Sequence, residues 1–137
     1  MDLVGRYDNS SIDIEGSEES LRQLSYLLQH ISGAHTLALA NSAPQSPYPA
    51  LAKTLKFEIA DDSVCVARSG DEISMRGAPD KFEVLAQNIL ALADQKQEQR
   101  AGQLRLHSHI EYYPGHFFLK AESIPLVITK IEGNRIF

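Results

Sequence analysis

The feature that most constrains the fold is a pattern that occurs twice: an alternating strand, a glycine and an amphipathic helix. In the first copy, residues 11–15 alternate in polarity, Gly16 follows, and Ser17 is a good N-cap for a helix. Seven positions of this copy match residues of similar type 61 positions later in the chain. The matched pairs are Ile12 and Ile73, Ile14 and Met75, Gly16 and Gly77, Leu21 and Phe82, Leu24 and Leu85, Leu28 and Ile89, and Ile31 and Leu92.

Each copy continues with two further strand-like segments, which makes two strand–helix–strand–strand units. Such units predict an α+β fold: a two-layer sandwich with a mixed or mostly antiparallel sheet and two helices on one face. We expect a single domain of residues 1–137, with an internal β-α-β-β duplication whose halves cover about 11–60 and 72–131. The further strands are expected at residues 35–40 and 55–60 in the first half and around 104–113 and 126–131 in the second, with an extra strand at 63–68.

Composition excludes several classes of function. The net charge of −5 argues against nucleic-acid binding, which normally requires a basic surface. Cys65 is the single cysteine, so neither an internal disulfide nor a cysteine-based zinc site is expected. The N-terminal residues lack the apolar run of a signal peptide or a membrane helix, so we expect a cytoplasmic protein without membrane contact.

Three of the five histidines fall within ten residues of the second half. Before Pro114 the residues alternate, so His107, His109, Glu111 and Tyr113 share one face of a predicted strand. His116 follows the Pro114–Gly115 turn. If the helices cover the apolar sheet face, the opposite face is open and carries a polar set: Asp13, Glu15, Glu72, Ser74, Arg76, Arg105, His107, His109 and Glu111.

This histidine row is compatible with three kinds of chemistry. His107 and His109, together with Glu111 or His116, have donors that suit zinc or another first-row metal. A His–Glu pair with Tyr112 or Tyr113 would suit acid–base catalysis, although no nucleophile shares that face. Tyrosine, histidine and carboxylate side chains on a rigid strand are also typical of protein interfaces.

The segment from His107 to Leu119, with Glu122–Ser123 and the apolar residues 126–128, resembles the signature of the immunity protein 32 family of bacterial polymorphic toxin systems. One departure is Phe117, where the family pattern has a proline after the last histidine. The resemblance implies a small α+β antitoxin that is not an enzyme, requires no cofactor or metal, and neutralises a cognate toxin by binding it.

The acidic chain would fit a basic, nuclease-type toxin. The candidate partner-binding residues are His107, His109, Glu111, Tyr113, His116, Glu15 and Asp13. The alternative is a small metal-dependent or acid–base enzyme that uses the row of His107, His109 and Glu111.

Overall fold

The computed structural model describes residues 1–40, 50–96 and 104–132. Within these ranges it contains two helices and nine strands. The strands are β1 (Val4–Tyr7), β2 (Ile12–Gly16), β3 (Ala34–Ala38), β4 (Ala50–Ala52), β5 (Thr54–Ile59), β6 (Cys65–Ser69), β7 (Glu72–Gly77), β8 (Leu104–Ile110) and β9 (Leu126–Glu132); the helices are α1 (Glu18–Gln29) and α2 (Pro79–Asp94).

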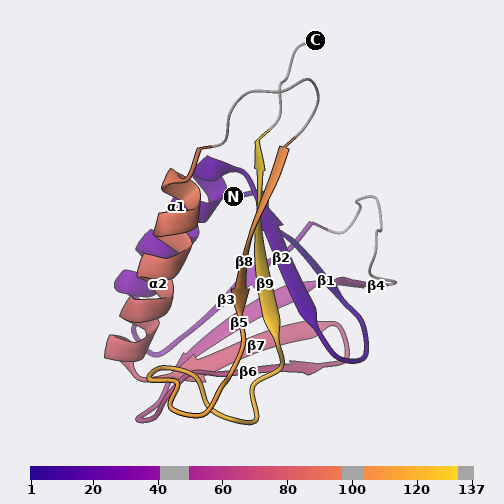
Figure 1. Cartoon of the computed structure of the whole chain (residues 1–137). Helices are drawn as coiled ribbons and strands as arrows, with labels where there is room; N and C mark the ends of the chain where they lie inside the picture. Colours follow the sequence, from indigo (N-terminus) through magenta and orange to yellow (C-terminus); the bar gives the residue numbers. More distant parts are fainter. Residues whose placement is uncertain (41–49, 97–103, 133–137) are drawn as a thin grey trace.

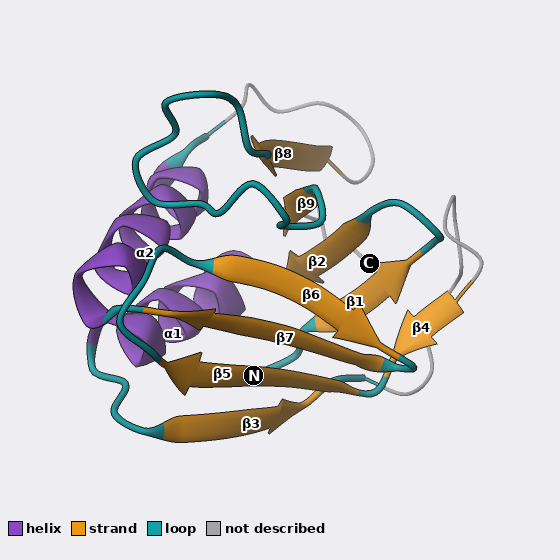
Figure 2. Ribbon diagram, turned by 90° about the horizontal axis from the view of Figure 1, so that it is seen from below, coloured by secondary structure: helices purple, strands orange, loops and turns teal. Residues whose placement is uncertain are grey.

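The strands form two mixed sheets. Sheet A has the order β4-β1-β2-β9-β8, and sheet B has the order β3-β5-β7-β6. Both helices lie together on one side of the molecule, and the strands of the two sheets run in different directions (Figures 1 and 2). The predicted α+β class is confirmed, and the strands divide between two sheets where the sequence suggested one. Among the described residues, neither helix is long and apolar enough to cross a membrane.

The strands divide between two sheets because each sheet joins the two halves of the chain through one parallel strand pair. Strand β5 of the first half pairs in parallel with β7 of the second, and β9 of the second half pairs in parallel with β2 of the first. Each sheet therefore combines strands from both halves. Parallel pairing between distant segments leaves no local mark in a sequence, so a single sheet could not be distinguished from two.

Equivalent positions in the two halves occupy equivalent places in the backbone. Val4 pairs with Glu15 across β1 and β2, and Cys65 pairs with Arg76 across β6 and β7, which is the same register shifted by 61 positions. The two helices pack against each other. At their contact, the buried Ser25 hydroxyl donates a 2.8 Å hydrogen bond to the carbonyl of Ala86, the residue 61 positions later.

Gly16 and Gly77 end strands β2 and β7, directly before the two helices. Neither has a positive φ. Both instead allow a close approach of neighbouring groups: a Cβ at Gly16 would lie 2.9 Å from Leu3 Cδ2, and one at Gly77 would lie 2.9 Å from the backbone Cα of Val64. Both positions between strand and helix therefore favour glycine, because a Cβ atom would clash with its neighbours. The restriction is stronger at Gly77, where the clash is with backbone atoms of Val64.

Candidate functional site: the aromatic connection between β8 and β9

The chain leaves β8 at Ile110 and turns sharply at Pro114–Gly115. The backbone N–H of His116 donates to the carbonyl of Tyr113 at 2.9 Å, and Gly115 has a φ of +89°. Proline followed by a glycine with positive φ is the pattern of a type II turn. The turn reverses the chain and places the aromatic side chains on both of its sides near one another.

His116 fixes the conformation of this turn. Its Nδ1 accepts hydrogen bonds from the backbone N–H groups of Phe118 and Leu119 at 3.3 and 3.1 Å. A nitrogen that accepts these bonds carries no proton, and burial lowers the pKa of the imidazole in agreement with that state. The ring also packs edge-to-face on Phe118, with a centroid distance of 4.5 Å. His116 is therefore a neutral support inside the connection.

The second part of the connection closes the free edge of sheet B at β6. The backbone of Val64 donates to Phe118 and accepts from Lys120, at 2.7 and 2.8 Å. The Ser123 hydroxyl accepts from the backbone N–H of Val66 at 3.1 Å and donates to the carbonyl of Val64 at 3.2 Å. Phe118 and Leu119 are buried in the core. These residues of the family-like motif are structural.

The first part of the connection exposes three aromatic rings, which we call the aromatic surface: Tyr112, Tyr113 and Phe117. Their exposed fractions are 40%, 57% and 61%. They account for three of the five large hydrophobic side chains that are exposed in the described part of the chain. The ring of His116 lies 4.6 Å from that of Tyr113 and 6.2 Å from that of Phe117, so all these rings pack around one support.

A hollow of about 300 Å³ lies beside the aromatic surface, between the connection and helix α2. Tyr113, Phe117, Glu111 and Asn88 contribute to its lining. The amide nitrogen of Asn88 donates to the carbonyl of Val84 at 2.9 Å, which leaves the amide oxygen as an acceptor. Glu111 also lies 3.7 Å from His109 Nδ1, and both of these side chains are largely exposed. The hollow thus combines aromatic rings with oxygen acceptors.

His107 belongs to a different structure, a polar chain that crosses the outer face of sheet A. The Thr129 hydroxyl donates to Asp13 at 2.6 Å and lies 3.0 Å from His107 Nδ1. Because the hydroxyl gives its proton to Asp13, it receives the Nδ1–H of His107, and His107 keeps the Nε2 position for other partners. Arg6 continues the chain, with its guanidinium 2.7 Å from Glu15 and 3.8 Å from Asp13.

The expectation of an open polar face is wrong at Asp13 and Glu15, which are only 5% and 6% exposed. Strand β1, which the alternation analysis did not identify, places Arg6 beside both carboxylates and makes their burial tolerable. Burial raises the pKa of the Asp13 carboxyl, against the opposing hydrogen bond from Thr129. The structure therefore links Asp13 to His107 through Thr129 and buries both Asp13 and Glu15.

The described residues bring together few groups that could hold a metal. No cluster of three or more histidine, cysteine, aspartate or glutamate side chains is found among them. The rings of His107 and His109 lie 6.5 Å apart, and His107 Nδ1 is engaged with Thr129. The pair formed by His109 and Glu111 offers two donors at most.

Sequence reasoning missed several residues that build the site. Continuing the alternation to residue 113 sets Tyr112 on the face opposite His107 and His109, whereas β8 ends at Ile110 and Tyr112 is exposed. Phe117 stood out only as a departure from the family pattern. Asn88 sits on α2 and gave no signal, because its position beside the hollow depends on how the helix packs against β8.

Comparison with known proteins gives one family match, which lies in the second half of the chain. Residues 72–131 match the family model of Immunity protein 32. The resemblance that the histidine segment predicted is thus confirmed, and it extends from β7 through α2 and β8 to β9. It includes the whole aromatic connection. No curated protein and no solved structure matches the chain.

Proposed function

We propose that this protein is an immunity protein that neutralises a cognate toxin of a bacterial polymorphic toxin system by binding it, without catalysis, in the cytoplasm. The observation that carries the proposal is the aromatic surface within the segment that matches Immunity protein 32. Exposed aromatic side chains concentrated in one place on a monomer are characteristic of binding sites. Tyrosine in particular is enriched among residues that dominate binding energy.

The connection is suited to binding because it is held rigid before a partner arrives. The turn at Gly115, the bonds to His116 and the docking on β6 fix its backbone. A rigid surface loses less conformational entropy on association than a mobile loop. Tyr112, Tyr113 and Phe117 each have only two side-chain torsions, so ordering them costs little more.

The hollow beside the aromatic surface favours a cationic side chain of the toxin. The Glu111 carboxylate and the Asn88 amide oxygen are acceptors, and the rings of Tyr113 and Phe117 present π faces. The net charge of −5 would further attract a basic toxin, such as one that acts on nucleic acid. His109 and Glu111 then act as contact residues, with His116 as the support beneath them.

Co-expression tests the proposal. The toxin encoded beside this protein is produced in a host with wild-type protein, with the double variant Tyr113→Ala/Phe117→Ala, or with Tyr26→Ala. Tyr26 is a matched control because it is 65% exposed and lies on α1, outside the matched segment. We expect growth rescue and co-purification with wild type and Tyr26→Ala, and loss of both with the double variant. Failure of the wild-type protein to rescue growth or to bind the toxin would contradict the proposal.

A further inference from the structure

Strand β3 is an edge of sheet B that the described chain leaves uncovered. The other edge of sheet B, at β6, is bridged by the protein's own chain through the β8–β9 connection. Four of the five residues of β3 are exposed. Natural proteins usually protect such an edge with lysine, proline or a bulge, because its unpaired backbone groups can pair with another strand. The sequence Ala34-His-Thr-Leu-Ala38 has none of these features.

The register of β3 on β5 shows which backbone groups face outward. Ile59 N–H donates to the carbonyl of Gly33, and Leu39 N–H donates to the carbonyl of Lys53. Hydrogen-bonded pairs alternate along an antiparallel ladder, so His35 and Leu37 also bond to β5. The N–H and C=O groups of Ala34, Thr36 and Ala38 therefore point away from the sheet, toward solvent.

We propose that a second copy of this chain pairs with β3, strand β3 against strand β3, to join two B sheets around a twofold axis. The outward-bonding residues read Ala-x-Thr-x-Ala, which is the same in both directions. An antiparallel copy centred on Thr36 would thus place Thr36 opposite Thr36 and Ala34 opposite Ala38, with up to about six hydrogen bonds. Cross-strand threonine pairs are favourable, and β3 carries no Asp, Glu, Lys or Arg that would be repelled by its copy.

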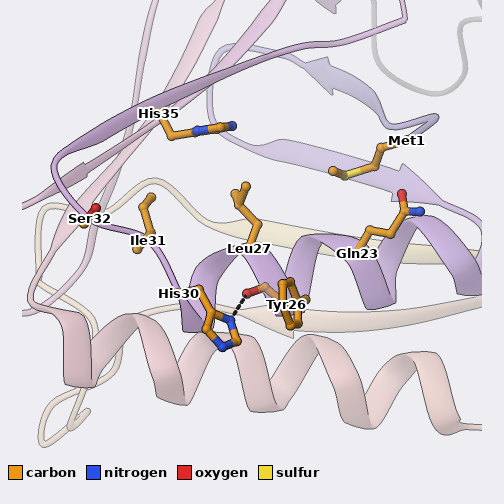
Figure 3. A pocket seen from close by; sticks show the side chains of 8 residues that line it. All are labelled: Met1, Gln23, Tyr26, Leu27, His30, Ile31, Ser32 and His35. Atoms are coloured by element: carbon orange, nitrogen blue, oxygen red, sulfur yellow. Dashed lines mark hydrogen bonds between the residues drawn. The ribbon is translucent and has the colours of Figure 1, made fainter.

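The groove between β3 and α1 supports this pairing. Figure 3 shows Tyr26 and Leu27 from α1 on one side of it and His35 from β3 on the other. Met1 and Tyr26, the two exposed large hydrophobics of the described chain that lie outside the aromatic surface, line the same groove. In the paired arrangement Leu37 of the second copy lies opposite His35, so an apolar side chain is brought to the rim of this groove.

Strand β8, which is an edge strand of sheet A, is less suited to pairing with its own copy. The sequence of β8 contains Arg105, His107 and His109, and basic residues of this kind are a common protection of an edge strand against pairing. A charged or proline-containing strand from a toxin would gain nothing from the Ala-x-Thr-x-Ala palindrome of β3. The self-complementary order of small, uncharged residues favours a second copy of the chain over a foreign strand.

Sedimentation velocity tests the proposal on wild type and three variants over about a hundredfold range of concentration at moderate salt. Thr36→Lys places like charges opposite each other, and Thr36→Pro removes an outward N–H without touching the β5 ladder. Ser74→Lys is the matched control, because Ser74 lies on the same sheet face but in an inner strand. Circular dichroism and thermal unfolding confirm that each variant is folded.

We expect wild type and Ser74→Lys to become dimers as concentration rises, and both Thr36 variants to remain monomers. A wild-type monomer throughout would overturn the proposal. So would dimers of both Thr36 variants, or a monomeric Ser74→Lys protein, since the contact would then lie elsewhere. The result is independent of toxin neutralisation: the Thr36→Lys monomer is expected to rescue growth, and loss of rescue with a monomeric wild type would assign β3 to the toxin instead.

Discussion

The two connections that close the sheet edges, residues 39–53 and 111–125, are equally long but built differently. In the first half, β4 lies antiparallel to β1 and forms a regular ladder. In the second half, the connection contacts β6 through one bridge, the Ser123 hydroxyl and a backbone bond from Ile124 to Val66. It exposes the aromatic surface. One repeated backbone plan thus carries a regular strand ladder in one half and exposed aromatic rings, the proposed recognition surface, in the other.

The outer faces of the sheets differ in the same way. Asp13 and Glu15 correspond to Ser74 and Arg76, 61 positions later. In sheet A the two carboxylates are buried with Arg6, whereas in sheet B Ser74 is only half-buried and Arg76 is exposed near Glu58. The repeated scaffold fixes backbone position, and the charge and size of the outward side chains decide whether a face becomes part of the interior.

The largest effect is expected from separating the halves. We propose that residues 1–137 fold as one domain, since strands from both halves pair within each sheet. A fragment of residues 1–62 lacks β7 and would leave Leu55 and Phe57 without their cover. It is expected to remain unfolded by circular dichroism, while the whole chain unfolds in one transition. A cooperative transition in the fragment would show that the halves are independent.

The next effect compares the two glycine corners. Gly77→Ala is expected to lower the free energy of unfolding by about 2–3 kcal/mol, because the new Cβ meets the backbone of Val64. Gly16→Ala meets only side-chain atoms of Leu3, Ser20 and Leu21, and is expected to cost about 1 kcal/mol. Urea unfolding of both variants measures the difference. Equal costs would mean that the corner at Gly77 can relax as easily as the one at Gly16.

A smaller effect tests how the second connection is fastened. Ser123→Ala removes the acceptor of the Val66 N–H and is expected to cost about 1–2 kcal/mol in urea unfolding. Ser10→Ala provides the control, because the Ser10 hydroxyl makes only an exposed 3.4 Å contact with Asp8. Its expected cost is within about 0.5 kcal/mol of zero. If Ser123→Ala also leaves the free energy of unfolding unchanged, backbone hydrogen bonds alone hold the connection on β6.

The smallest effect appears only as a dependence on pH. The pKa of Asp13 is raised in the folded protein, so the folded state binds its proton more tightly than the unfolded state. The Asp13 contribution to stability therefore falls as pH rises from the ordinary value of 3.8 through the raised pKa, and returns on acidification. Asp13→Asn should flatten this part of the stability profile relative to wild type. An unchanged profile would mean that Asp13 titrates as it does in the unfolded chain.

Local patterns predicted the elements of this fold far better than their assembly. The helix after Ser17 follows from its N-cap and apolar spacing, and the helix that begins at Pro79 follows from apolar spacing; both are present. Strand β1 was missed because four residues with a central glycine give too short an alternation to recognise. Because β1 was not predicted, nothing placed Arg6 beside Asp13, and the burial of Asp13 could not be predicted either. Of the two parallel pairs that join the halves, β2 and β9 pair residues more than 100 positions apart, which no local pattern could show.

The candidate site was predictable in part for the same reason. The histidine segment lies in the region that the family model matches, yet its members separate in space. His116 supports the turn, His107 joins the network of Asp13, and His109 remains at the surface with Glu111. Alternation gave the side of the strand on which each residue lies. It gave no information about residues beyond Ile110, where the strand ends and the exposed rings begin.

The central claim is that the aromatic surface of the second half, and not the exposed tyrosine on α1 of the first half, binds the toxin. Calorimetric titration of the co-purifying toxin into three proteins tests it most directly. Relative to wild type, Tyr113→Ala is expected to weaken binding by about 30-fold or more, since exposed tyrosines at interface centres contribute about 2 kcal/mol or more. Tyr26→Ala, equally exposed on α1, should bind within about twofold of wild type. Unchanged affinity for Tyr113→Ala together with a large loss for Tyr26→Ala would contradict the account.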